Sequence, residues 1–110
     1  YHKLYSDFSE PKTDAVQKFL KEVRHALKPG GLVIVIDHDA EKGSSIATAS
    51  SINRLSDEIV MSDMKNAGFE FVDNIHILKD DWEDDLTISA FDPSVIGSTS
   101  RFVHKYRSPN

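Results

Sequence analysis

A helix, a glycine turn and an apolar strand follow one another in the first third of the chain, and this unit constrains the fold most. Apolar side chains recur at spacings of three and four through residues 14–27, which predicts an amphipathic helix. Pro29 and the pair Gly30-Gly31 end that helix and permit a sharp reversal. Residues 32–36 are five consecutive large apolar residues, the pattern of a parallel strand covered on both faces. We therefore expect a central strand of an open α/β sheet.

Length and composition restrict the class of protein. A chain of 110 residues supports a single domain, residues 1–110, which on the usual scaling buries roughly 65% of its unfolded surface. The 39% hydrophobic and 28% charged residues are near the averages of globular domains, and no apolar run approaches the length of a bilayer span. A net charge of −5 offers no basic surface for a phosphate backbone. We expect neither a membrane nor a nucleic acid as partner.

The chain has no cysteine, which excludes disulfides, thiolate catalysis and zinc–cysteine sites and is compatible with a reducing compartment. No signal-peptide pattern is visible, and we expect a cytoplasmic protein. The first residue is Tyr1 rather than methionine. We interpret the chain as a fragment whose natural start lies upstream.

Local signals predict the remaining elements. Residues 1–12 have the pattern of a polar loop, with Thr13 or Asp14 capping the first helix, and residues 43–51 that of a flexible loop or a short helix. Even-numbered apolar spacing predicts strands at 69–78 and 101–106. Ser56 is placed to cap a second helix, and Gly68 to end it in a Schellman motif.

Several short motifs resemble the C-terminal half of a class I S-adenosylmethionine-dependent methyltransferase. The run Leu27-Lys28-Pro29-Gly30-Gly31 before a strand that closes on Asp37-His38 resembles the fifth-strand region of these enzymes. Ala67-Gly68-Phe69 resembles the entry to their sixth strand, and Arg101-Phe102-Val103 resembles the seventh. The chain is most similar to a group of predicted bacterial methyltransferases with the motifs Y-H-D, D-H, H-R-I and R-G-T-D-R-F. It departs from that group at Lys3, Asn53 and Ser100.

The resemblance implies a partial Rossmann-like methyltransferase sheet in an α/β fold. In the family's strand order, 3-2-1-4-5-7-6, this chain supplies strands 5, 7 and 6, with its two main helices on one face. The glycine-rich loop and the acidic residue with which the family holds S-adenosylmethionine belong to strands that are absent from this chain. We therefore expect no cofactor-binding residue in this segment, since Gly30-Gly31 lies at the end of the strand opposite the ligand. The implied function is a segment of a methyltransferase for an unknown small acceptor, inactive on its own.

Four residues are candidates for catalysis. Asp37 and His38 follow a strand's carboxyl end, where open sheets place ligands, and a carboxylate beside an imidazole can act as a base or a metal ligand. The alternative is the opening of a solvated loop. By resemblance, Tyr1 and His2 flank the methyl-acceptor site, although as terminal residues they are expected to fray.

The other charged and histidine residues favour structural roles. The acidic residues between 80 and 85 lack the glycine and the final glutamate of a calcium loop, so we expect a solvated loop and no metal site. His25 lies near a helix C-terminus, where a cation is favoured. His76 and His104 alternate within predicted strands and are expected at the surface or an edge.

A sheet reduced to three strands leaves strand 32–36 with an uncovered face and an unpaired edge. At about 25 cal/mol per Å2, the exposed apolar area amounts to several kcal/mol. We expect a homodimer formed through the 32–36 region, by strand pairing or exchange of elements, unless the missing N-terminal half covers it. The alternative function is therefore a non-catalytic homodimerising module derived from a methyltransferase.

Overall fold

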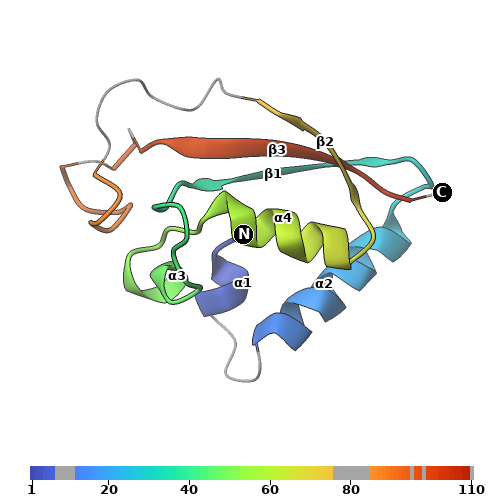
Figure 1. Ribbon diagram of the computed structural model, residues 1–110, viewed down its shortest axis with the longest axis horizontal. Helices are drawn as coiled ribbons and strands as arrows, with labels where there is room; N and C mark the ends of the chain where they lie inside the picture. Colours follow the sequence, from blue (N-terminus) through green and yellow to red (C-terminus); the bar gives the residue numbers. More distant parts are fainter. Residues whose placement is uncertain (7–11, 76–84, 95, 98, 110) are drawn as a thin grey trace.

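The chain forms a three-stranded antiparallel sheet with helices on one side (Figure 1). The computed structural model describes residues 1–6, 12–75, 85–94, 96–97 and 99–109. The strands are β1 (Leu32–His38), β2 (Glu70–Asn74) and β3 (Arg101–Arg107), in the order β1-β3-β2. The helices are α1 (Lys3–Ser6), α2 (Lys12–Ala26), α3 (Thr48–Ser51) and α4 (Asp57–Asn66). The expected α/β class is confirmed.

Strand β1 forms as predicted, but its pairing differs from the prediction. It pairs antiparallel with β3, in a register that runs from Leu32 opposite Arg107 to His38 opposite Arg101. Within the described residues β1 is therefore an edge strand with one antiparallel partner and not the central strand that the apolar run predicts. A run of apolar residues indicates burial, but it carries no information on the direction of the neighbouring strand.

The two faces of β1 are covered unequally. Val35 is buried against the helices, whereas Leu32, Ile34 and Ile36 on the other face are 47%, 50% and 48% exposed. The described residues thus leave one face of the strand open, as expected for a sheet reduced to three strands. The apolar run alone predicts that both faces of β1 are covered, and the described residues do not provide this.

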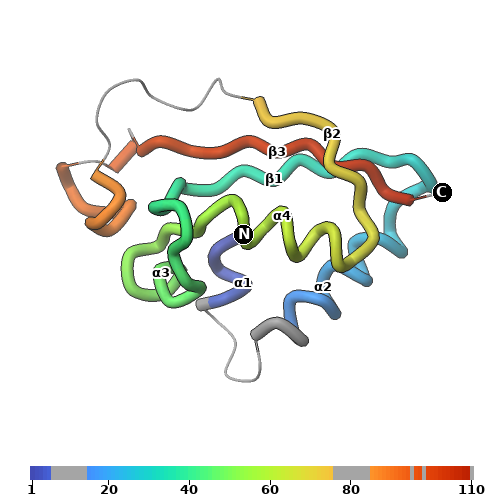
Figure 2. Tube along the Cα trace, viewed as in Figure 1, coloured from blue at the N-terminus to red at the C-terminus, as the bar shows by residue number. Residues whose placement is uncertain are grey.

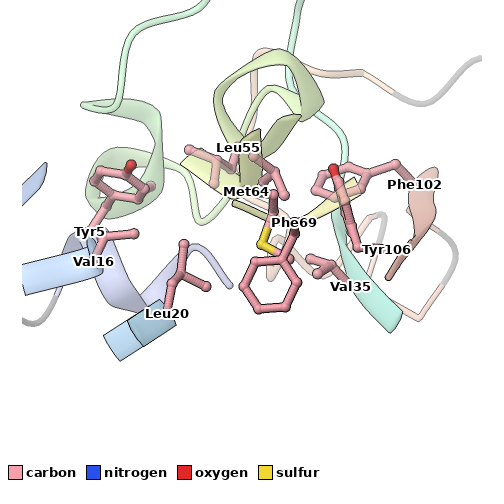
Figure 3. Packing of buried hydrophobic residues seen from close by; sticks show 11 residues of the cluster. Tyr5, Val16, Leu20, Val35, Leu55, Met64, Phe69, Phe102 and Tyr106 are labelled. Atoms are coloured by element: carbon pink, nitrogen blue, oxygen red, sulfur yellow. The ribbon is translucent and has the colours of Figure 1, made fainter. Parts of the chain in front are cut away.

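The core lies between the helices and the covered face of the sheet (Figure 3). Helix α2 contributes Val16 and Leu20, and α4 contributes Met64. Strand β3 supplies Phe102 and Tyr106, both at most 1% exposed, because its alternate side chains point toward the helices. This shared core explains why α2 and α4 lie on the same side of the sheet.

Helix α4 begins and ends as its sequence predicts. Ser56 takes the extended N-cap conformation, although its hydroxyl makes no hydrogen bond there. At the other end Gly68 adopts φ +91°, its N–H donates to the Lys65 carbonyl (3.0 Å), and the Phe69 N–H donates to Met64 (2.9 Å). This is the predicted Schellman motif.

Three boundaries differ from the prediction. Residues 3–6 form α1 instead of continuing a loop, and α2 begins at Lys12, so Thr13 and Asp14 lie inside its first turn. Residues 48–51 form the short helix α3, one of the two alternatives for 43–51. The predicted strand 69–78 is β2, and its continuation beyond Ile75 lies outside the described residues.

The C-terminal end of the chain returns to the turn between α2 and β1 (Figure 2). The Gly30 N–H donates to the Ser108 carbonyl (3.1 Å), and the Ser108 N–H donates to the Gly31 carbonyl (2.7 Å). Gly30-Gly31 therefore lies at the opposite end of β1 from Asp37. Among the described helices, none combines the length and the apolar character that crossing a membrane requires.

Candidate functional site

The carboxyl end of β1 meets the first residues of the chain in a buried polar cluster. The backbone N–H of His2 donates to Asp37 Oδ2, and the ring nitrogen Nδ1 of His2 lies 2.8 Å from Asp37 Oδ1. The backbone nitrogen of Tyr1 lies 3.0 Å from the same carboxylate. His2 and Asp37 are 6% and 5% exposed. The expected fraying of Tyr1-His2 is therefore wrong, and Asp37 belongs to the strand and not to a solvated loop.

Hydrogen bonds keep Asp37 ionised. Burial alone raises the pKa of a carboxyl group, but the hydrogen bonds from the His2 ring and from the His2 backbone N–H lower it. The pKa of Asp37 is lowered to about 2. A charged carboxylate can only accept, so the hydrogen between Asp37 and His2 sits on Nδ1 of the imidazole.

His38 lies beside this pair with a separate partner. Its backbone N–H donates to Asp37 Oδ1 (2.7 Å), and its Nδ1 lies 2.7 Å from Thr99 Oγ1. Its ring centroid is 6.1 Å from that of His2 and 5.7 Å from that of Phe91, which meets it edge-on. Burial lowers the pKa of His38, although Asp37 opposes the shift. The ring is therefore uncharged at neutral pH.

Arg54 fixes the neighbouring segment to the end of β1. It is fully buried, its Nη1 donates to the Asp39 carbonyl (2.9 Å), and its Nε donates to the Ile88 carbonyl (2.8 Å). Ser100 donates to the Asp39 carboxylate at 2.7 Å. Sequence reasoning assigned no role to Arg54.

The side chain of Tyr1 points to a second cluster, away from Asp37. Its hydroxyl donates to Asp63 Oδ2 (2.9 Å), and the hydroxyl of Tyr5 donates to the same oxygen. Burial raises the pKa of Asp63 despite these donors, and burial together with Asp63 raises the pKa of both tyrosines. This cluster attaches α1 to α4. Of the four candidates, the structure therefore brings together the side chains of His2, Asp37 and His38.

The other histidines and acidic residues lie apart from this cluster. His104, predicted at the surface or an edge, is fully buried in the central strand, with Nδ1 2.9 Å from the Tyr106 hydroxyl and Nε2 3.4 Å from Asp57. His25 is exposed in the last turn of α2, while His76 and residues 80–84 lie outside the described part. Within the residues that the structure describes, no three histidine or acidic side chains are arranged to hold a metal ion.

An open groove of about 380 Å3 runs along the exposed edge of β1, close to the polar cluster. Its lining is mostly apolar and comes from the two N-terminal helices, β1 and α4: Leu4, Phe19, Leu20, Val23, Val33, Ile34, Val35, Ile36 and Met64, with Tyr1 and Lys3 also lining it.

Comparison of the chain with protein-family models, with curated proteins and with solved structures gives no match. The candidate site is therefore interpreted from its own geometry.

Proposed function

We propose that this chain is the acceptor-side segment of a class I S-adenosylmethionine-dependent methyltransferase. The observation that carries the proposal is the strand order β1-β3-β2, with β3 antiparallel between its neighbours. Strands that follow one another along the chain usually lie side by side, so a last strand inserted between the first two is a restrictive arrangement. It is the order that the family resemblance implies for strands 5, 7 and 6.

The uncovered surface of β1 supports the same proposal. Leu32, Ile34 and Ile36 are each about half exposed on one face, and no strand of the described residues pairs with the outer edge of β1. In the proposed whole protein, a further parallel strand and a second layer of helices cover both. The three described strands thus have the properties of one side of a larger sheet.

The polar cluster lies where such a sheet binds ligands. His2, Asp37 and His38 gather at the carboxyl end of β1, the end at which open α/β sheets place their ligands. Phe91 and Thr99 border them from the segment before β3. We propose this end of β1 as the side of the site that contacts the methyl acceptor.

The proposal includes that the described residues do not by themselves bind S-adenosylmethionine. The pair Gly30-Gly31 lies at the opposite end of β1, where a Cβ on Gly31 would stand 2.9 Å from the Lys28 carbonyl oxygen. Close packing in a turn therefore accounts for glycine there, without a ligand. We propose that residues outside these 110 bind the cofactor, and the proposed location of the protein is the cytoplasm.

A second candidate function, a self-association module, rests on the edge of β1. Residues 32–36 carry no charge, so two copies can pair antiparallel without like-charge repulsion. With the symmetry axis at Ile34, Leu32 would face Ile36 of the other copy, and Val33 would face Val35. The product is a continuous six-stranded sheet whose apolar stripe is shared by both subunits.

Two measurements on the natural polypeptide that contains these residues test the first candidate. The intact mass shows whether the polypeptide extends beyond residues 1–110, and calorimetric titration with S-adenosylhomocysteine shows whether it binds the cofactor product. We expect a longer polypeptide that binds, while the 110-residue chain, as control, does not. A natural polypeptide of 110 residues, or a longer one without binding, contradicts the proposal.

A further inference from the structure

One nitrogen of the polar cluster has no partner. Nε2 of His2 is buried and makes no hydrogen bond within the described residues, whereas Nδ1 of the same ring is held by Asp37 at 2.8 Å. Leaving a buried polar atom without a partner destabilises the folded state. A nitrogen that is kept in place at this cost is a candidate for binding a ligand group.

The hydrogen bonds around Asp37 determine which ring nitrogen of His2 carries hydrogen. The carboxylate accepts from the backbone N–H of His2, from the backbone N–H of His38 (2.7 Å) and from His2 Nδ1. Because Nδ1 donates to the carboxylate, the neutral ring has its lone pair on Nε2. This is the arrangement in which a carboxylate orients a histidine to act as a base.

We propose that Nε2 of His2 is the proton acceptor for a phenolic hydroxyl group of the methyl acceptor, and that Asp37 is its positioning residue. The O–H bond of the ligand breaks, the proton passes to Nε2, and the electron pair stays on the ligand oxygen. The Asp37 carboxylate balances the charge of the resulting imidazolium. The inference deepens the proposed function and rests on it for the identity of the reaction.

Two observations select the phenolic class. A neutral imidazole takes a proton far more readily from a phenol, with a pKa near 10, than from an aliphatic alcohol. The ring centroid of His38 lies 6.1 Å from that of His2, and the ring centroid of Phe91 lies 5.7 Å from that of His38. They provide an aromatic surface on which a planar ligand can pack.

Entry to the site requires a side chain to move, since His2 is 6% exposed. Phe91 borders the site through the His38 ring: it is 48% exposed, meets that ring edge-on, and belongs to the 85–94 segment, which has no helix or strand. Arg54 holds that segment through the Ile88 carbonyl at 2.8 Å, so Phe91 can rotate while its backbone stays attached.

Nitrogen-detected NMR of the histidine rings tests the inference on the chain itself. At a pH where the rings are neutral, we expect His2 with hydrogen on Nδ1 and a bare Nε2, and this preference should weaken in Asp37→Asn. Titration with phenol, the probe, should then move the Nε2 resonance of His2. The variant His25→Gln, at an exposed histidine in the last turn of α2, is the matched control and should keep the His2 response.

The outcomes separate this inference from the proposed function. Hydrogen found on Nε2 of His2, or a Nε2 resonance that phenol leaves unmoved to its solubility limit, overturns the inference even if the natural polypeptide binds S-adenosylhomocysteine. If that polypeptide methylates a phenol, His2→Gln should lower kcat at least tenfold with KM little changed. A purely structural His2 would instead alter folding and leave the kcat of the folded fraction unaffected.

Discussion

At the scale of single residues, the buried carboxylate of Asp37 organises the candidate site. It is 5% exposed and binds the backbone and ring of His2 and the backbone of His38. A buried carboxylate with this many donors stabilises the folded state only while it is ionised. The ionisation of Asp37 therefore links the site to the stability of the chain.

This link gives a pH dependence with a defined sign. The pKa of Asp37 is lowered from 3.8 to about 2 on folding, so its contribution is complete above pH about 4 and is lost as the pH falls toward 2. The shift corresponds to about 2 kcal/mol. Urea unfolding of the wild type should show this loss between pH 4 and 2, and Asp37→Asn should not. Parallel curves for the two proteins would contradict it.

The tyrosine pair on Asp63 provides a second residue-scale prediction. Tyr5→Phe removes a donor from a buried carboxylate that then keeps only Tyr1 among its tyrosine partners. We expect the free energy of unfolding to fall by about 1–2 kcal/mol, measured by urea denaturation. Tyr106→Phe is a matched control, because it also removes a buried hydroxyl, one whose hydrogen-bond partner is the His104 ring and not Asp63. An equal loss of unfolding free energy in both variants would contradict this, because the hydrogen bond from Tyr5 to Asp63 would then stabilise no more than another buried hydroxyl.

The sequence predicted the identity of the site residues better than their environment. Asp37 and His38 follow an apolar run, so the sequence alone predicted that they lie at the end of a strand. The burial of His2 and His104 was not, because it depends on contacts with β1 and the aromatic residues of β3. Contacts between residues far apart in sequence leave no local pattern.

At the scale of the elements, local signals determine where helices and strands begin and end. The end of α4 follows from Gly68, whose φ of +91° other residues rarely adopt. Strand pairing, in contrast, depends on neighbours that no local pattern specifies, which is why the apolar run of β1 does not reveal its antiparallel pairing with β3. The alternation of exposed and buried residues in β1 was also hidden, because both sets are apolar.

The Schellman motif gives a prediction for Gly68→Ala. A Cβ there imposes left-handed strain and meets the Arg24 guanidinium at 3.0 Å, so we expect a loss of about 1–2 kcal/mol in the free energy of unfolding. Gly43→Ala is the control: its φ is +80°, but a Cβ meets nothing within 4 Å, and its exposed loop can relax. Thermal unfolding that shows a larger loss for Gly43→Ala would contradict this account.

At the scale of the whole molecule, the described helices cover one face of the sheet, and on its other face Leu32, Ile34 and Ile36 of β1 stay about half exposed (Figure 1). Burying the exposed surface of Leu32, Ile34 and Ile36 would stabilise the protein by about 25 cal/mol for each Å2 removed from water. A domain of ordinary stability, about 5–15 kcal/mol, gains substantially from covering them. Both candidate functions use this gain, through a further part of one polypeptide or through a second copy.

Light scattering on the 110-residue chain distinguishes the self-association module. If β1 edges pair, the chain should be a dimer, and Ile34→Lys should convert it to a monomer with unchanged circular dichroism, since two lysines would meet at the symmetry axis. Phe91→Lys, at another exposed apolar residue, is the control and should remain dimeric. A monomeric wild type at concentrations near 1 mM would count against this candidate.

Amide hydrogen exchange along β1 tests the central claim, that this strand is interior to a larger sheet. In β1 only every second N–H can reach β3, and the others point to the open edge. In the natural polypeptide, or in the dimer, we expect slow exchange at all the amides of Leu32–His38. Fast exchange at every second amide, under conditions where the rest of the sheet is protected, would show that β1 is a true edge and would contradict the account.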